Sequence, residues 1–86
     1  MPELKETTAL MESDDYKKRF VAEYLQLVIR FDKLNRMLKG WDAGTLEFEP
    51  ACCRGLYNLQ IRAMADYIAV LEARAQIENI NLWRSE

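Results

Sequence analysis

The chain has 86 residues, half of them hydrophobic, and a formal net charge of −2 at pH 7. This length allows one small domain with a marginal core, and such domains are commonly stabilised further by disulfides, metals or oligomerisation. The acidic balance argues against a general binder of long nucleic acids, because such proteins carry an excess of positive charge.

The chain has no histidine, and its two cysteines, Cys52 and Cys53, are neighbours in the sequence. Two adjacent thiols cannot supply the four ligands of a zinc site, and a disulfide between them would be strained. We therefore predict no metal, no cofactor, and two free, half-buried thiols in a reducing cytoplasm. Without a leader or an apolar run of membrane length, we expect a cytoplasmic protein that does not associate with membranes.

The first long helix is expected over about residues 14–39, after a weakly helical N-terminal segment, 1–12. Ser13 fits its N-cap. Gly40 and Gly44 are expected to stop the helix, and Gly40 fits the left-handed position after a C-cap. Between them, large apolar residues recur every three or four positions, which is the spacing of one helix face. They are Tyr16, Phe20, Tyr24, Leu27, Phe31, Leu34, Leu38 and Trp41.

A loop over residues 40–50 follows, and we expect its Leu46 and Phe48 to cover the end of the hairpin. Pro50 fits the first turn of a second long helix over about 51–83. The apolar residues of that helix fill an arc of about 200°, against about 100° for a helix with one buried face. One line holds Leu56, Leu59, Ala63, Tyr67 and Val70, and the other holds Tyr57, Ile61, Met64, Ile68, Leu71 and Ala75.

These elements predict an all-α fold: an antiparallel hairpin of two long helices, forming one domain over residues 13–84, with a short N-terminal helix in front of it. A single partner helix cannot cover the apolar arc of the second helix. We therefore expect identical copies to assemble as a homodimer or a higher homo-oligomeric helical bundle.

Polar residues occupy one edge of the first helix, beside Tyr16. The ridge consists of Arg19, Glu23, Gln26, Arg30, Lys33 and Met37. On the second helix, Arg74 projects from the apolar arc, where an unpaired charge would be costly to desolvate. One interpretation is a structural ion pair between Arg74 and either Glu23 or Glu78. A second is an anion site at a subunit boundary, where arginines bind phosphate and a tyrosine stacks on a base. A third treats the basic residues as solvated surface.

The pattern of the two helices also resembles a known family over residues 13 to about 82. The matching positions are Tyr16, Arg19, Phe20, Glu23, Leu27, Arg30, Lys33 and Leu34 in the first helix, and Leu56, Leu59, Gln60, Met64, Tyr67, Leu71, Glu72 and Arg74 in the second. In them the chain resembles small phage and prophage proteins related to short crAss-like phage proteins. These are similar to the helical hairpin domain of phage inhibitors of the CBASS and Thoeris defences. Cys52-Cys53 departs from the family, in which Cys-Pro is common.

The resemblance implies a non-catalytic sponge in the cytoplasm of an infected or lysogenic bacterial host. Such proteins oligomerise and sequester a cyclic nucleotide signal, either a cyclic oligonucleotide or a cyclic ADP-ribose isomer. The resemblance also implies ligand contacts from Tyr16 and from Arg30 or Lys33. With the residues that the polar pattern singles out, the candidate ligand-binding set is Tyr16, Arg19, Arg30, Lys33 and Arg74.

Two other functions fit the same sequence. A protein-binding inhibitor or adaptor would dock on a host defence protein, such as a CRISPR nuclease, through Val21, Leu25 and Val28 on the far side of the first helix. A purely structural helical bundle would bind no small ligand. The absence of a phosphate-binding glycine loop and of a nucleophile paired with histidine makes us expect no enzymatic activity.

Overall fold

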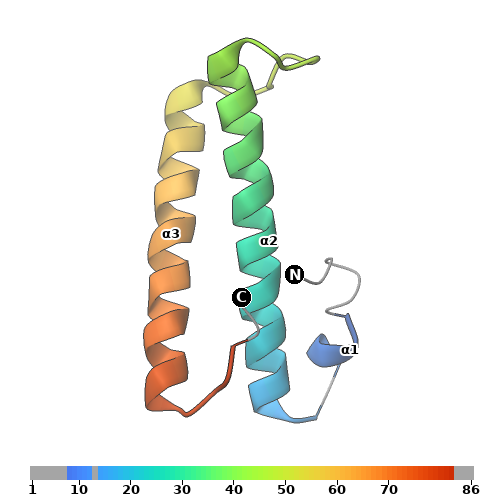
Figure 1. Ribbon diagram of the computed structural model, residues 1–86, viewed down its shortest axis with the longest axis vertical. Helices are drawn as coiled ribbons and strands as arrows, with labels where there is room; N and C mark the ends of the chain where they lie inside the picture. The colour runs from blue at the N-terminus through green and yellow to red at the C-terminus, as the bar shows by residue number, and fades with distance from the viewer. Residues whose placement is uncertain (1–7, 13, 83–86) are drawn as a thin grey trace.

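A computed structural model of the chain describes residues 8–12 and 14–82. These residues form three α-helices, α1 (Thr8–Met11), α2 (Tyr16–Ala43) and α3 (Arg54–Ile77), and contain no strand. The two long helices α2 and α3 run antiparallel and side by side, and α1 packs against α2 near its N-terminal end (Figure 1). The predicted all-α fold with two packed helices is therefore confirmed.

The predicted N-terminal helical segment is described only in part. Its residues 8–11 form the single helical turn α1, and residues 1–7 lie outside the described residues. The extent of that segment therefore stays a prediction.

Helix α2 begins and ends at residues other than those predicted. Its N-cap is Asp15, whose carboxylate accepts a hydrogen bond of 2.9 Å from the backbone N–H of Lys17, whereas Ser13 lies outside the described residues. At the other end, Gly44 adopts the left-handed conformation with φ 74° and donates its N–H to the carbonyl of Trp41. Of the two glycines predicted to stop the helix, Gly44 is the one that does so, because it can take the left-handed conformation at no steric cost. The left-handed position predicted for Gly40 is wrong, since Gly40 lies within the helix.

Helix α3 is shorter than predicted at both ends. It begins at Arg54 with Cys53 as N-cap, so Pro50 lies in the loop and not in a first helical turn. It ends at Ile77 because Asn79 takes the left-handed conformation with φ 58°, and the N–H of Ile80 then bonds to the carbonyl of Ala75 at 2.8 Å. This is a Schellman-type stop with asparagine in the usual glycine position. Residues 79–82, which we call the returning segment, fold back from this stop.

The buried core lies between the N-terminal half of α2 and the C-terminal part of α3. Its members are Phe20, Val21, Tyr24, Leu25, Val28, Ile68, Leu71, Ala75 and Ile80. Ile80 belongs to the returning segment, and the partly buried Leu82 packs against the same cluster. The chain thus covers this end of α2 from more than one side, which a plain two-helix hairpin would not do.

The predicted docking surface on the far side of α2 is part of this core. Val21 is 7% exposed, and Leu25 and Val28 are fully buried. They are covered because α1 packs on α2 and Ile80 returns to the same cluster, so α3 is not the sole partner of α2. The prediction that these three residues bind a host protein is therefore wrong.

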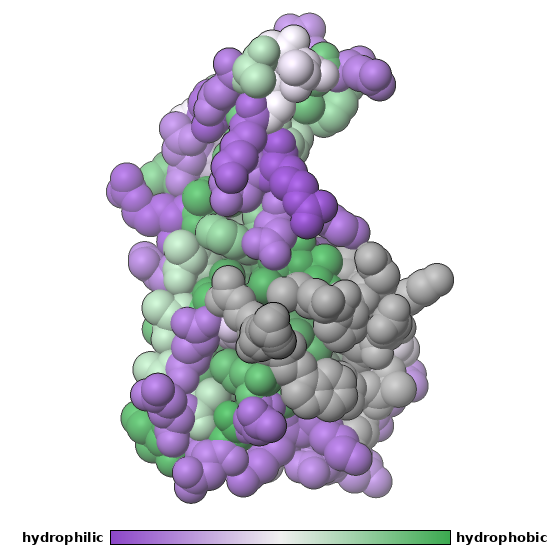
Figure 2. All heavy atoms as spheres, in the orientation of Figure 1, coloured by the Kyte–Doolittle hydropathy of each residue, from purple (hydrophilic) through white to green (hydrophobic). Residues whose placement is uncertain are grey.

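The outer line of α3 remains uncovered in one copy of the chain. Leu56, Leu59 and Val70 are 55–57% exposed, Tyr67 is 43% exposed and Ile77 is 80% exposed. In Figure 2, hydrophobic side chains reach the surface at the lower left, over the C-terminal part of α3. The predicted excess of apolar surface is present, whereas assembly into an oligomer stays a prediction.

The loop and the thiols depart from expectation in smaller ways. Leu46 is half-buried and approaches Gly40, but Phe48 is 59% exposed and does not cover the hairpin end. Cys52 and Cys53 are free and both exposed, because α3 begins only after them. No helix in the described part of the chain has the length and apolar character needed to cross a membrane.

Candidate functional site

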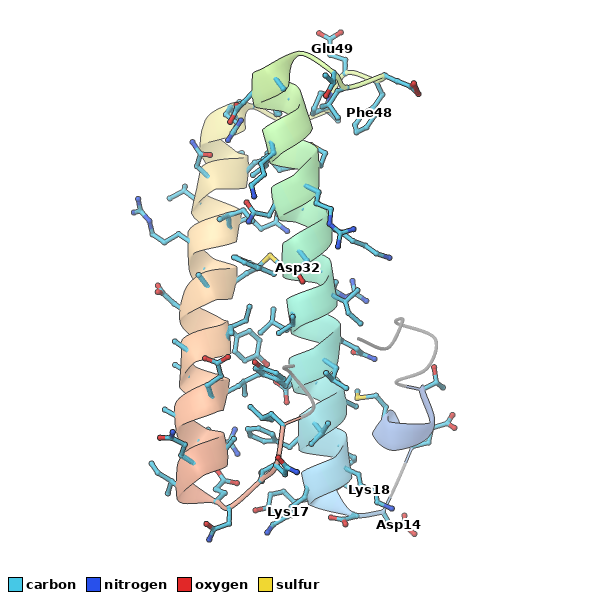
Figure 3. The ribbon with its side chains drawn as sticks, viewed as in Figure 1. Asp14, Lys17, Lys18, Asp32, Phe48 and Glu49 are labelled. Carbon is cyan, nitrogen blue, oxygen red and sulfur yellow. The ribbon has the colours of Figure 1, made fainter. Side chains whose placement is uncertain are left out.

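Tyr16 and Arg74 meet because the start of α2 lies beside the end of α3. The Tyr16 hydroxyl donates a hydrogen bond of 3.1 Å to Oε1 of Glu78, and Arg74 Nε donates one of 2.8 Å to Oε2 of the same carboxylate. Lys17, at the same end of the hairpin (Figure 3), donates from Nζ to the backbone carbonyl of Asn79 at 3.4 Å. One carboxylate therefore holds two of the candidate ligand residues in place.

Arg74 is accommodated by an ion pair and by an aromatic ring. Its pairing with Glu78, four residues later on α3, confirms one of the two structural pairings that the sequence left open. The guanidinium carbon also lies 4.8 Å from the ring centroid of Phe20, within the range of a cation–π contact. Because the Arg74 side chain is 48% exposed, it still reaches solvent and any ligand there.

The protonation states follow from these contacts. The hydrogen bond from Arg74, then the one from Tyr16 and the positive charges of Arg74 and Lys17, lower the pKa of Glu78 below its ordinary value. The hydrogen bond to Glu78 raises the pKa of Tyr16, and the same carboxylate raises the pKa of Arg74. At neutral pH the group consists of an ionised carboxylate, a charged guanidinium and a neutral phenol that donates its proton.

Tyr16 and Arg74 border a cavity of about 310 Å³ to which all three helices contribute. Its lining residues are Met11, Tyr16, Arg19, Phe20, Glu23 and Arg74. Two guanidinium groups suit phosphate oxygens, and the half-exposed Tyr16 ring suits a planar base. We call this the Tyr16–Arg74 cavity. It contains three of the five residues that the sequence singled out.

Arg30 and Lys33 lie elsewhere. Both are exposed on α2 and belong by helical spacing to the ridge of Arg19 and Glu23. At 1.5 Å per residue, Arg30 is about 21 Å from Tyr16 along the helix axis. Neither Arg30 nor Lys33 therefore lines the cavity that Tyr16 borders.

The sequence argument missed the link between Tyr16 and Glu78, and it did not assign Met11 to the site. Glu78 was a candidate only as a partner of Arg74, on the same helix. The hydrogen bond that Glu78 accepts from Tyr16 joins the two long helices. Predicting this bond requires knowing which residues of α2 lie level with which residues of α3. The antiparallel arrangement supplied a signal, since it places the first turn of α2 level with the last turn of α3.

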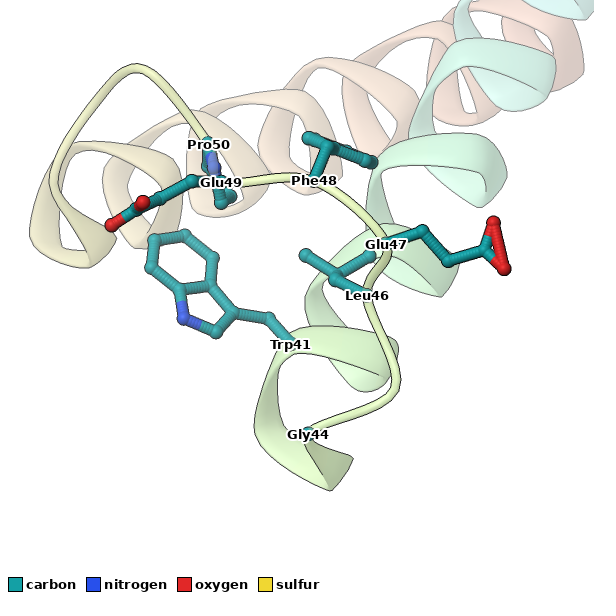
Figure 4. Close-up of a pocket in the computed structure, with 7 residues that line it drawn as sticks. All are labelled: Trp41, Gly44, Leu46, Glu47, Phe48, Glu49 and Pro50. Atoms are coloured by element: carbon teal, nitrogen blue, oxygen red, sulfur yellow. The ribbon is translucent and has the colours of Figure 1, made fainter.

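A larger cavity, of about 490 Å³, lies at the opposite end of the hairpin. It is lined by Trp41, Gly44, Leu46, Glu47, Phe48, Glu49 and Pro50. In Figure 4 the Trp41 indole and Leu46 face this cavity, the Glu49 carboxylate lies beside the indole, and Glu47 points away. The nearby Arg54 already pairs with Asp42 and lies 5.6 Å from the Trp41 ring centroid. Acidic loop residues make this cavity a poor anion site, despite its size.

A family model described as Sequestin matches residues 14–77, which include all of α2 and α3. No curated protein and no solved structure matches the chain. The family's name describes sequestration, and so suggests a protein that binds a ligand and not one that transforms it. Because the match covers well over half of the sequence, the chain belongs to the Sequestin family.

Proposed function

We propose that the chain is a sponge for a cyclic nucleotide signal, which it binds without cleaving. The observation that carries the proposal is the convergence of Tyr16, Arg19 and Arg74 on one cavity from two antiparallel helices. The Sequestin match supports ligand sequestration in general, and the cyclic nucleotide is our assignment from the chemistry of the cavity and the resemblance of the helices.

The proposed roles follow from donor geometry. Arg74 donates to Glu78 through Nε, so its terminal amino groups are the donors that a phosphate would take. Arg19 supplies a second guanidinium at the same cavity. Tyr16 is 48% exposed, and its ring offers a face on which a base can stack. Glu78 fixes Tyr16 and Arg74 before the ligand arrives, which lowers the entropy lost on binding.

Arg30 and Lys33 belong to the same proposed binding set in a different role. They continue the ridge that begins at Arg19 and add positive potential beside the cavity. Such a potential attracts an anionic ligand and raises its association rate, most strongly at low salt. We therefore expect substitutions there to change association more than dissociation.

The setting of this function is also part of the proposal. We infer a phage or prophage protein that acts in the cytoplasm of its bacterial host, against a signal of the CBASS or Thoeris type. We further infer a homodimer or higher homo-oligomer. A ligand site usually encloses 70% or more of the ligand surface, and the half-exposed Tyr16 and Arg74 leave this cavity open.

A purified effector assay tests the proposal. A defence effector is activated by adding its cyclic nucleotide directly, with no signal-producing enzyme present. We expect the chain to block activation and the nucleotide to be recovered unchanged after the protein is denatured by heat. A protein-binding inhibitor of the synthesising enzyme would leave the effector fully active, and a hydrolase would return altered nucleotide. Either result would contradict the sponge.

A further inference from the structure

Glu23 is an acidic residue in the wall of the Tyr16–Arg74 cavity, which we propose as an anion site. It is half-buried, and in the described part of the chain no hydrogen bond or ion pair joins it to another side chain. After the bond to Glu78, the charge of Glu23 is a further cause of the raised pKa of Arg74, so the two groups lie near each other. Both oxygens of Glu78 already accept hydrogen bonds, from Tyr16 and from Arg74. Of these two carboxylates, Glu23 is therefore the one whose oxygens are not yet engaged.

A carboxylate in this position works against the binding of an anion. Its charge repels phosphate, and the repulsion is stronger at a half-buried site than in water. A bound ligand would also strip water from the carboxylate, which costs free energy unless other donors replace that water. A ligand offsets both costs if it brings its own hydrogen-bond donors to Glu23. The cavity therefore suits a ligand that carries phosphate at one position and N–H donors at another.

We propose that Glu23 reads the base of the ligand, and that this base is guanine. The inference rests on the proposed function, because it names the cyclic nucleotide that the cavity takes. Guanine carries the donors N1–H and N2–H side by side on its Watson–Crick edge. They match the two oxygens of an ionised carboxylate in a pair of parallel hydrogen bonds.

The other common bases do not match a carboxylate in this way. Adenine N1 and cytosine N3 are acceptors, and each points a lone pair at the carboxylate beside the single amino donor of that base. Uracil places one N–H between two carbonyl oxygens, which the carboxylate repels. Since a buried acceptor that faces another acceptor is costly, Glu23 rejects these bases as well as selecting guanine.

The order of side chains along α2 fits this division of the ligand. Tyr16, Arg19 and Glu23 follow each other at intervals of three and four residues, so they lie on one side of the helix. Tyr16 and Glu23 are about 10 Å apart along the axis at 1.5 Å per residue. A purine base and the side chains that hold it fill a gap of this size. Tyr16 then takes the face of the base and Glu23 its edge, while Arg19 and Arg74 take phosphate.

A plainer role for Glu23 is to balance the charges of the two arginines. That role is blind to the base, because any cyclic dinucleotide carries the same phosphates. Charge balance therefore predicts equal affinity for all bases, and it predicts that removal of the charge strengthens the binding of every anion alike. Base readout predicts neither result.

Three cyclic dinucleotides with the same backbone test the readout on the unaltered chain. Their bases are guanine, hypoxanthine, which lacks the N2 amino group, and adenine. By isothermal titration calorimetry we expect guanine to bind most tightly, hypoxanthine about tenfold more weakly, and adenine about a hundredfold more weakly, since one and then both hydrogen bonds to the carboxylate are lost. Equal affinity for guanine and adenine, or tighter binding of adenine, would overturn the proposal.

A matched pair of variants assigns the preference to Glu23. The amide of Glu23→Gln offers one acceptor and one donor, the pattern that complements N6–H and N1 of adenine. We expect this variant to lose at least tenfold in affinity for the guanine dinucleotide and to gain affinity for the adenine one. Glu47→Gln removes the same charge at the opposite end of the hairpin and should change neither. Circular dichroism checks that both variants keep their helix content. Tighter binding of all three dinucleotides by Glu23→Gln would show charge balance and overturn the readout.

The outcomes separate this inference from the proposed function. Binding of dinucleotides without a preference for guanine, or of cyclic ADP-ribose isomers alone, removes the readout by Glu23 and leaves the sponge. Absence of binding by the three dinucleotides, the cyclic trinucleotides and the cyclic ADP-ribose isomers removes the sponge, and the readout with it.

Discussion

The Tyr16 hydroxyl and the Glu78 carboxylate form a hydrogen bond of 3.1 Å across 62 positions of sequence, joining the first residue of α2 to the C-cap of α3. The same carboxylate accepts a hydrogen bond from Arg74. The contact therefore fixes the register of α2 against α3 at the end where the candidate cavity lies. The same carboxylate thus holds the hairpin together and positions two residues of the proposed ligand site.

Replacing Tyr16 with phenylalanine tests this coupling. Tyr16→Phe keeps the ring but removes the donor, so the pKa of Glu78 should rise toward its ordinary value while the bond from Arg74 still holds it below. An NMR titration of the Glu78 side chain measures the change. The control is Tyr57→Phe at the far end of the hairpin, which should leave that pKa unchanged. An unaltered Glu78 pKa in Tyr16→Phe would contradict the contact.

Stability should depend on acid through Glu78. Because the folded-state pKa of Glu78 lies below its ordinary value of 4.5, its contribution is present above that pH and is lost as pH falls through the folded pKa. The variant Glu78→Gln lacks this charge. Its Tm should therefore lie below that of the unaltered chain at pH 7, with the difference shrinking toward pH 3. A difference in Tm that stays constant over this range would refute the assignment.

Tyr24 makes a buried counterpart of the Tyr16 contact. It is 1% exposed and donates a hydrogen bond of 2.5 Å to Oε2 of Glu72 on α3. Tyr24→Phe deprives a carboxylate of that donor, which should lower the free energy of unfolding by about 1–3 kcal/mol. Urea denaturation measures it, with Tyr57→Phe as a control expected to change little. Equal stability of the two variants would mean that the Tyr24 hydroxyl does not support the hairpin.

Substitution by alanine should have opposite effects on stability at Gly44, which ends α2, and at Gly55, in the first turn of α3. Gly44 has φ 74°, so Gly44→Ala should destabilise the chain by about 1–2 kcal/mol. Gly55 lies in the first turn of α3 with nothing within 4 Å of an added Cβ, so Gly55→Ala should stabilise by up to about 1 kcal/mol. Urea denaturation of both variants is the measurement. A gain at Gly44 would exclude the left-handed C-cap.

The pairing of the helices was predictable, but their caps were not. Apolar spacing alone located α2, α3 and the uncovered outer line of α3. The exact ends were not predictable because several possible cap residues lie within about one turn of each other. Asp15 is the N-cap in place of Ser13, and of the two predicted glycines Gly44, not Gly40, takes the left-handed position. Cap energies differ by only about 1 kcal/mol, so packing decides among them.

The burial of Val21, Leu25 and Val28 was unpredictable for a different reason. Helical spacing shows that a second apolar face exists on α2, but not which segment covers it. Ile80 does so only because the chain reverses at Asn79, and left-handed asparagine gives no strong sequence signal. An apolar face that looked free for a partner is therefore core.

The candidate site was predictable in its residue types and only partly in its membership. The ridge on α2 runs along the helix axis, whereas the cavity occupies one end of the hairpin. Arg19 is therefore at the cavity, and Arg30 and Lys33 are not. To predict which of these basic residues lines the cavity, one must know where the last turn of α3 lies along α2. That position depends on the register of the hairpin.

Isothermal titration calorimetry tests the central claim most directly. A panel of cyclic di- and trinucleotides and cyclic ADP-ribose isomers is titrated into the unaltered chain, Arg19→Ala and Arg36→Ala. Arg36 is an exposed arginine of the same helix that lies off the ridge. We predict saturable binding of at least one nucleotide, weakened at least tenfold by Arg19→Ala and unchanged by Arg36→Ala. The absence of heat with every member of the panel, or equal binding by the two variants, would contradict the account.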